Sequence, residues 1–230
     1  MATQDATTGE RTEPDGAPQP DWAQIIRTRL AGSVPRHAPS DWLIPGTWEG
    51  TSQGYRRLFP GEPVPAAVLI PLVERGELTA LFTQRATQLR NHAGQVSFPG
   101  GRIEPGDANE QAAALREARE EIGLDERFVS VIGYLPDHLV ITGFRVTPVV
   151  AFVQPGFELL PAKEEVADTF EVPVSYLFDP ANHILQRRRS GVTGEWLDFR
   201  DIPFGERNIW GATAGMLLTL YRLCSGAPAP

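Results

Sequence analysis

The order of strand-like and helix-like segments after residue 65 is the feature that most constrains the fold of this chain. The apolar, branched run AAVLIPLV (66–73) has the length of a strand, and ERGE then turns the chain into LTALFTQR (78–85), which predicts a hairpin. Residues 108–121 are rich in helix formers, and residues 208–224 are apolar almost all round, which predicts a buried helix. Further strands are predicted over 128–135, 145–153, 183–189 and 195–200. Strands interspersed with two helices predict an α/β sandwich with a mixed sheet.

The segments on either side of this region differ from it in composition. Residues 1–21 are rich in Thr, Gly, Pro and acids and carry half of the chain's formal charge of −8, so we expect a disordered acidic tail. Residues 22–65 are predicted to hold a short amphipathic helix, capped by Asp21, and then a proline-rich connection. The compact domain is expected over residues 66–225, with a tail at 226–230.

Composition also excludes several classes of partner. The negative net charge argues against a general nucleic-acid-binding surface, which would be basic. Cys224 is the only cysteine, so no intrachain disulfide can form and a reducing compartment fits. The first twenty residues lack the basic and apolar regions of a signal peptide, and the apolar runs are too short for a membrane helix. We therefore expect a soluble, cytoplasmic protein with no nucleic-acid or membrane partner.

The helix predicted around residues 108–121 carries a cluster of carboxylates. Asp107 and Glu110 have the spacing of a capping box at its start, and Gly123 can end it. Glu117, Glu120 and Glu121 stand at i, i+3 and i+4, so they project from one face within about 6 Å of each other. At an effective dielectric near 20, each pair repels by roughly 2–3 kcal/mol.

Two explanations account for this cluster. A solvated helix face, with Arg116 and Arg119 between the acids, is a common arrangement. A divalent cation would instead reverse the repulsion, because Mg²⁺ is typically held by carboxylates, waters and substrate phosphates. The glycine pair Gly100–Gly101 upstream favours the cation, since glycines let the backbone approach a metal or a phosphate closely.

Two long motifs resemble those of a known family. Residues 100–124, GGRIEPGDANEQAAALREAREEIGL, resemble the Nudix box G-x5-E-x7-R-E-U-x-E-E-x-G-U, where U is aliphatic; the half REAREEIGL fits except for Ala118 at the first U position. Asp107 stands where the box has Glu, and eight residues rather than seven separate it from Arg116. Residues 81–101, LFTQRATQLRNHAGQVSFPGG, resemble the signature L-L-T-x-R-[SA]-x3-R-x3-G-x3-F-P-G-G of the coenzyme A diphosphatase branch, with Phe82 as the one replacement.

The resemblance implies a Nudix-type α/β/α sandwich and a hydrolase that uses Mg²⁺ or Mn²⁺. Its substrate would be coenzyme A, with acyl derivatives as further candidates, cleaved to 4′-phosphopantetheine and adenosine 3′,5′-bisphosphate by a monomer or a homodimer. The metal ligands would be Glu117, Glu120 and Glu121, together with the carbonyl of Gly100. Arg116 would orient these carboxylates by charge-assisted hydrogen bonds, although a plain i,i+4 pair with Glu120 explains it as well.

The resemblance implies further site residues with alternatives still open. Glu165, in AKEEVADTFEVPV, would act as a base on the attacking water or as another metal ligand, or it is simply solvated like its neighbour Glu164. Arg85 and Arg90 suit phosphate recognition, with a surface salt bridge as the alternative. Gly100 and Gly101 would border the substrate.

Some residues of the chain have competing explanations outside this site. A structural role is expected for His92, and Cys224 is expected to be a buried small residue. The basic run Arg187–Arg189 fits an exposed strand, a dimer edge or a phosphate site.

Two other functions remain open at this stage. The same chemistry could act on ADP-ribose, NADH or a dinucleoside polyphosphate, and the signature at residues 81–101 is what favours coenzyme A. A non-catalytic nucleotide-sensing module would keep the fold, but such a module would be expected to lose carboxylates of the box, and all three are present.

Overall fold

The computed structural model describes residues 20–38, 40–43, 62–88, 93–140, 142–189 and 196–226. Within these ranges the main sheet has eight strands: five follow the order β3–β2–β1–β7–β5, while β4 pairs with β1, β6 with β7 and β8 with β2. The strands are β1 (Val64–Glu74), β2 (Leu78–Arg85), β3 (Val96–Ser97), β4 (Gly100–Arg102), β5 (Val129–Tyr134), β6 (His138–Val140), β7 (Phe144–Val153) and β8 (Val166–Pro173).

The central strand β1 is apolar along most of its length because both of its faces are covered. It runs parallel to β7 from Val64 to Val73 and antiparallel to β2, so the sheet is mixed, as predicted. Ile70 and Leu72 belong to the core on one face, while Leu69 and Val73 belong to the core on the other. A strand buried on both faces loses the apolar–polar alternation of a surface strand.

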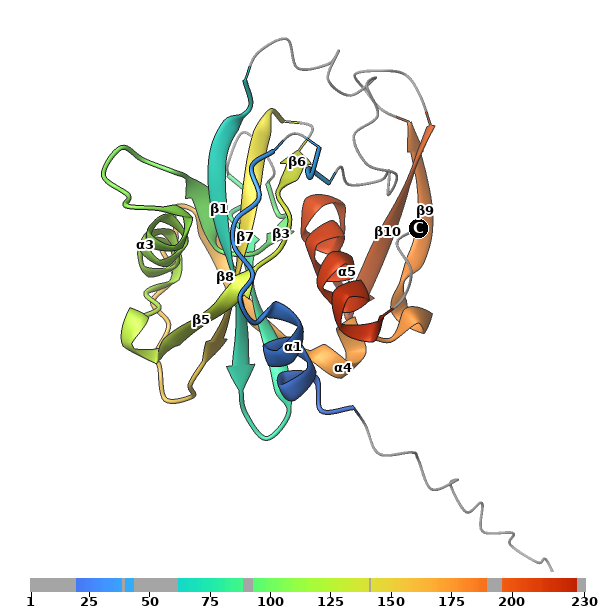
Figure 1. Cartoon of the computed structure of the whole chain (residues 1–230), viewed down its shortest axis with the longest axis horizontal. Helices are drawn as coiled ribbons and strands as arrows, with labels where there is room; N and C mark the ends of the chain where they lie inside the picture. The colour runs from blue at the N-terminus through green and yellow to red at the C-terminus, as the bar shows by residue number, and fades with distance from the viewer. Residues whose placement is uncertain are drawn as a thin grey trace, which may run out of the picture.

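Helices cover the two faces of the main sheet (Figure 1). Helix α3 (Glu110–Ile122) lies alone on one face, and α1 (Trp22–Leu30) and α5 (Gly211–Ser225) lie on the other. Short helical turns occur at η1 (Glu126–Phe128), α4 (Val174–Leu177) and η2 (Pro180–Asn182). In the part of the chain that the structure describes, no helix is both long and apolar enough to cross a membrane.

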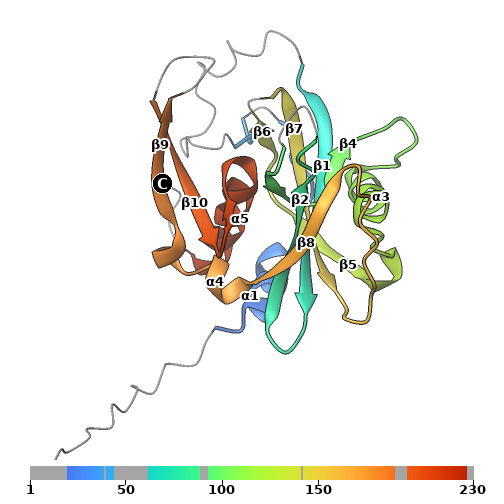
Figure 2. The same cartoon turned by 180° about the vertical axis from the view of Figure 1, so that it is seen from behind.

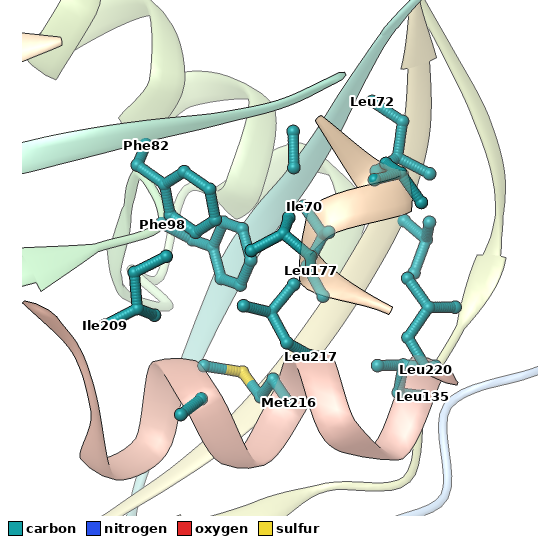
Figure 3. Close-up of a cluster of buried hydrophobic side chains, with 14 of the residues drawn as sticks. Ile70, Leu72, Phe82, Phe98, Leu135, Leu177, Ile209, Met216, Leu217 and Leu220 are labelled. Atoms are coloured by element: carbon teal, nitrogen blue, oxygen red, sulfur yellow. The ribbon is translucent and has the colours of Figure 1, made fainter. Parts of the chain in front are cut away.

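The larger core lies between the sheet and α5 (Figure 3). Phe82 and Phe98 stack with ring centroids 4.9 Å apart. Leu217 of α5 points toward Ile70, and Leu220 lies beside Leu135 at the other end of the cluster (Figure 3). Leu217 and Leu220 are buried to 1% and 0% exposure, which explains why the sequence of α5 is apolar almost all round.

A second, three-stranded sheet packs on the far side of α5 (Figure 2). It consists of β9 (Ile184–Arg189), β10 (Trp196–Phe204) and β11 (Arg207–Ile209), all antiparallel. Helix α5 is therefore enclosed between two sheets, and a space lined by both of them becomes available for a ligand.

The N-terminal segment is tied to the rest of the fold. Asp21 caps α1 as predicted, accepting the N–H of Gln24 at 3.0 Å. Ile26 and Leu30 are completely buried against the core that contains α5. Further along, His37 Nδ1 lies 2.9 Å from Asp137, a carboxylate with no exposed side-chain surface that also accepts from Arg145.

Most of the predicted strands and both of the long predicted helices are present, with changed ends. The hairpin β1–β2 is confirmed, and the strands predicted over 183–189 and 195–200 are present as β9 and β10, which pair with each other. No strand was predicted between residues 86 and 107, but β3 and β4 lie there. Strands β6, β8 and β11 were not predicted. The expected disorder of residues 1–19 lies outside the described residues.

A buried histidine makes stability depend on pH. His138 is completely buried beside α5, with Nδ1 3.0 Å from the carbonyl of Pro136, and burial lowers its pKa to about 4. In the unfolded chain the pKa is about 6.5, so the unfolded state binds a proton that the folded state does not between these values. This contribution to stability is present above pH 6.5 and is lost as pH falls toward 4, by roughly 3 kcal/mol in all.

Urea denaturation at pH 7 and pH 5 of the wild type and of His138→Gln tests this expectation. Glu121 acts in the opposite sense, because its pKa is raised, so the difference between the two proteins is the informative quantity. The wild type should lose about 2 kcal/mol more than the variant over this interval. Equal losses would show that His138 does not titrate as its burial requires.

Candidate active site

Helix α3 begins differently from the prediction. Asn109, not Asp107, is its N-cap and accepts the N–H of Ala112 at 2.9 Å, so the predicted capping box is wrong. Asp107 instead accepts the N–H of Glu104 at 2.8 Å and pairs with Arg116 on the second turn of the helix. The carboxylate of Asp107 thus orients the side chain of Arg116 rather than capping the helix.

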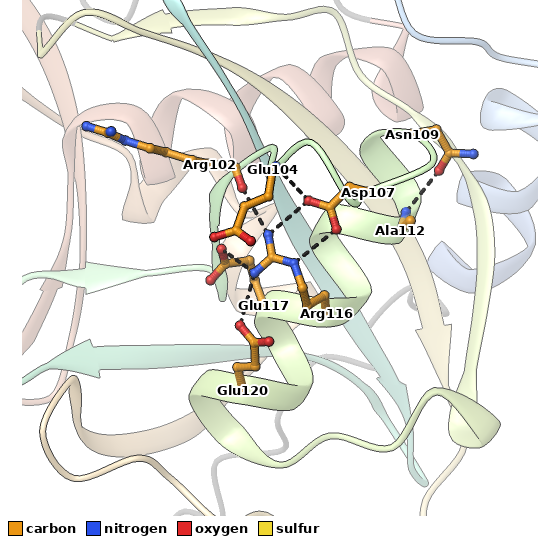
Figure 4. Close-up of polar contacts among 8 residues, drawn as sticks. All are labelled: Arg102, Glu104, Asp107, Asn109, Ala112, Arg116, Glu117 and Glu120. Atoms are coloured by element: carbon orange, nitrogen blue, oxygen red, sulfur yellow. Dashed lines mark hydrogen bonds and ion pairs between the residues drawn. The ribbon is translucent and has the colours of Figure 1, made fainter.

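Arg116 is the centre of the polar network on α3 (Figure 4). Both oxygens of Asp107 accept from it at 3.0 Å, and the carbonyl of Arg102 accepts at 3.0 Å. Its Nη1 donates to Glu117 at 2.9 Å and to Glu120 at 3.0 Å. These hydrogen bonds raise the pKa of Arg116 and lower that of Asp107, so the guanidinium is a fixed positive charge.

The three carboxylates of the predicted metal site differ in exposure. Glu121 is 5% exposed, while the side chain of Glu120 is 54% exposed and Glu117 lies between them at 16%. Glu121 accepts the N–H of Gly100 at 3.2 Å. Burial, and then the charges of Glu117 and Glu165, raise the pKa of Glu121 to about 7 despite that hydrogen bond.

Glu117 is destabilised in its charged form by the same surroundings. Burial is the main cause that raises its pKa, Arg116 opposes this, and the charges of Glu120 and Glu165 add to it. A carboxylate pair that is both desolvated and crowded by like charge favours a bound proton or a bound cation. This property goes beyond what a solvated helix face would show.

The glycine pair lets the backbone lie directly against these carboxylates. A Cβ on Gly101 would come within 2.4 Å of Glu117 Oε1, and a Cβ on Gly100 would come within 2.4 Å of the carbonyl oxygen of Ala67 in β1. Only glycine permits both approaches. Gly101 therefore lets β4 approach α3, and Gly100 lets β4 approach β1.

Gly101→Ala should lower activity more than stability. The new methyl group meets the flexible end of Glu117, which has to move, and a displacement of about 1 Å at a reacting centre can cost on the order of 10²-fold in rate. Turnover of the preferred substrate and urea denaturation measure the two effects. Gly106→Ala is the matched control, since nothing lies within 4 Å of its added Cβ. Full activity of Gly101→Ala would contradict the placement of Glu117 in the site.

Arg85 and Glu165 lie near the carboxylates, from two other elements. Arg85, at the end of β2, stabilises the charge of Glu121, and Glu165, just before β8, repels both Glu117 and Glu121. The strands that carry them are joined by the N–H of Ala86, which donates to the carbonyl of Glu165 at 2.8 Å. Arg90 and His92 lie outside the described residues.

A cavity of about 540 Å³ adjoins the glycine pair on the side of α5. Both sheets and α5 contribute to its walls, which are mainly apolar and include Val68, Phe144, Phe199, Trp210 and Met216. Gly100, Gly101 and Arg85 also line it, so the cavity reaches the carboxylate site.

Sequence reasoning missed this cavity and the role of Asp107. The second sheet follows the long apolar core in sequence, and no motif there indicates a ligand. For Asp107 a signal existed, because it occupies the position of the box glutamate. Cys224 is buried, as expected, and burial raises its pKa to about 11, so it is unreactive.

Residues 62–208 match the family described as NUDIX domain, and the chain therefore belongs to the Nudix family. It is a Nudix hydrolase, an enzyme that acts on nucleoside diphosphate derivatives. The predicted sandwich with a mixed sheet is confirmed.

Individual proteins also show similarity to this chain. An uncharacterized Nudix hydrolase, NudL, from Citrobacter koseri is 44% identical over 157 residues, which are 67% of this chain and 80% of that protein. A solved structure from Deinococcus radiodurans has a TM-score of 0.46 at 15% identity and covers 70% of this chain and 85% of its own. The NUDIX domain of Shewanella oneidensis NrtR, solved with ADP ribose, has a TM-score of 0.40 at 16% identity, over 54% and 84% of the two chains.

Proposed function

We propose that this chain hydrolyses the diphosphate of coenzyme A, giving 4′-phosphopantetheine and adenosine 3′,5′-bisphosphate, and that it requires Mg²⁺ or Mn²⁺. One observation carries the choice of substrate. The signature at residues 81–101 ends in Gly100 and Gly101, and its described part lines both the carboxylate site and the cavity through Arg85, Phe98 and the glycines. The segment that distinguishes this branch by resemblance is thus the segment that would border the substrate.

The residues present fit a divalent cation by the chemistry of their donors. Among the described residues no group of three or more His, Cys, Asp or Glu side chains converges closely enough to hold a metal, and Glu117 and Glu120 both accept from Arg116. Arg116 is held independently by both oxygens of Asp107 and by the carbonyl of Arg102. Glu117 and Glu120 can therefore exchange one hydrogen bond for a cation without releasing Arg116.

Glu117, Glu120, Glu121 and the carbonyl of Gly100 would hold the metal. When bound, Mg²⁺ or Mn²⁺ neutralises diphosphate oxygens and lowers the pKa of a bound water. Oxygen ligands of this kind are those that hard divalent cations prefer.

The chain's own residues contribute orientation and charge. Arg116 keeps the carboxylates of Glu117 and Glu120 at a fixed position on α3. Arg85 supplies a positive charge for a diphosphate oxygen, with Arg90 proposed for the same task. Glu165 would accept a proton from an attacking water, or serve as a further metal ligand. The protein is expected in the cytoplasm, as a monomer or a homodimer.

A product assay tests this proposal. Purified protein with Mg²⁺ is given coenzyme A, ADP-ribose and NADH in parallel, and products are identified by chromatography and mass. We expect adenosine 3′,5′-bisphosphate and phosphopantetheine to form fastest, and to be lost on adding a chelator. Faster cleavage of ADP-ribose or NADH would refute the choice of substrate and keep the chemistry.

A further inference from the structure

The charged side chains that line the cavity beside the glycine pair are all positive, although the chain as a whole is acidic. Among the described residues that line it there are four arginines and no aspartate or glutamate. The formal charge of the chain is −8, so this sign is not a property of the general composition. A concave, mainly apolar site with one sign of charge attracts ligands of the opposite sign. The ligand of this cavity should therefore be an anion with an apolar or aromatic part.

The arginines stand on opposite walls of the cavity. Arg85 lies in the main sheet at the carboxylate end, where its charge acts on Glu121. Arg188 and Arg189 lie in β9 of the second sheet, beyond α5. A ligand whose diphosphate lies at Arg85 would need a second anionic group to use the arginines of β9.

Arg188 is held in a fixed orientation. Its two terminal nitrogens donate to the two oxygens of Asp201 at 3.0 and 2.5 Å, and Asp201 is itself 5% exposed and accepts from Asn208 at 2.8 Å. The guanidinium lies 4.8 Å from the centroid of the Trp210 ring. The two hydrogen bonds to Asp201 use two of the five N–H donors of the guanidinium, which leaves donors for an anion.

The side chains around Arg188 suit a ligand in which a phosphate group lies close to a planar nucleotide base. Phe199 and Trp210 line the cavity beside it, and aromatic faces stack on bases. An arginine fork oriented by a carboxylate recognises phosphate oxygens by two parallel hydrogen bonds. The combination matches an adenosine that carries a phosphate monoester on its ribose.

We propose that Arg188, supported by Asp201 and Trp210, binds the ribose 3′-phosphate of the substrate and so selects coenzyme A over nucleotides that lack this group. This inference rests on the proposed function and adds a specificity-determining residue to it. ADP-ribose, NADH and dephospho-coenzyme A offer the diphosphate but no 3′-phosphate. The second sheet thereby determines which diphosphate compound is bound with its diphosphate at the carboxylates of α3.

Steady-state kinetics with coenzyme A and dephospho-coenzyme A test the inference. The wild type should favour coenzyme A in kcat/KM by roughly tenfold or more, as expected for charge-assisted hydrogen bonds. In the double variant Arg188→Gln/Asp201→Asn, which removes the pair without leaving a buried charge alone, the ratio should fall close to one. Arg187→Gln is the matched control, because this neighbour pairs with exposed Asp198 and does not line the cavity.

Calorimetric titration separates this inference from the proposed function. Adenosine 3′,5′-bisphosphate should bind the wild type about tenfold more tightly than AMP, and the double variant should bind the two alike. If coenzyme A is not cleaved, the proposed function fails, yet this binding difference would still support the site. Equal binding of both nucleotides by the wild type, or an unchanged preference in the double variant, would overturn the inference.

Discussion

Substituting Glu120 by glutamine is expected to lower kcat by roughly 10²–10³-fold while the urea midpoint of unfolding stays unchanged. The side chain is half exposed and accepts a hydrogen bond from Arg116, so the fold does not depend on its charge. The charge matters only if a cation and a diphosphate lie against this face of α3. Turnover, together with titration of Mn²⁺ into the protein, measures both consequences.

Glu126→Gln provides the control for this result. Glu126 is exposed in η1, which follows closely after α3. Its substitution by glutamine changes the net charge of the protein by the same amount as Glu120→Gln. It should keep wild-type turnover and Mn²⁺ affinity. Unchanged turnover in Glu120→Gln would remove the proposed metal role from this residue.

Replacing Asp137 by alanine should cost about 3–5 kcal/mol of unfolding free energy, the largest stability effect we expect. Asp137 has no exposed surface, accepts from Thr147 at 2.7 Å and from Arg145 at 2.5 Å, and its loss leaves the largely buried guanidinium of Arg145 without this carboxylate. Urea denaturation at pH 7 measures the change.

Asp168→Ala separates burial from ion pairing in this comparison. Asp168 also lies 2.5 Å from an arginine, Arg207, but its side chain is 49% exposed. An exposed pair contributes about 0–1 kcal/mol. If the two substitutions cost the same, burial of Asp137 is not the source of its effect.

The sequence predicted those parts of the fold that local pattern determines. Strands β1, β2 and β7 have long apolar runs, and α3 has good helix formers, so each was expected close to its observed bounds. Strands β3 and β4 have only two and three residues, and β4 contains two glycines. They form because β2 and β1 offer pairing partners. Such pairing is a tertiary effect that a local pattern does not contain.

The site shows the same division between local and tertiary information. Helical spacing placed Glu117, Glu120 and Glu121 on one helix, but it could not show that Glu121 is buried while Glu120 is exposed. That difference arises because β4 covers one side of α3 only. Asp107 was predicted to cap the helix because its spacing from Glu110 fits a capping box. In the structure both of its carboxylate oxygens instead accept hydrogen bonds from the side chain of Arg116.

The packing of α1 determines how far the N-terminus of this enzyme can be truncated. Sequence similarity to the family begins at residue 62, well after α1 ends. Ile26 and Leu30 nevertheless fill the core beside α5, and the hydroxyl of Ser33 accepts the N–H of Tyr134 in β5. A fragment that starts at residue 62 would leave an apolar patch open to water, and such patches promote aggregation. The segment of this chain that matches the family is therefore shorter than the segment that must be expressed to keep this core covered.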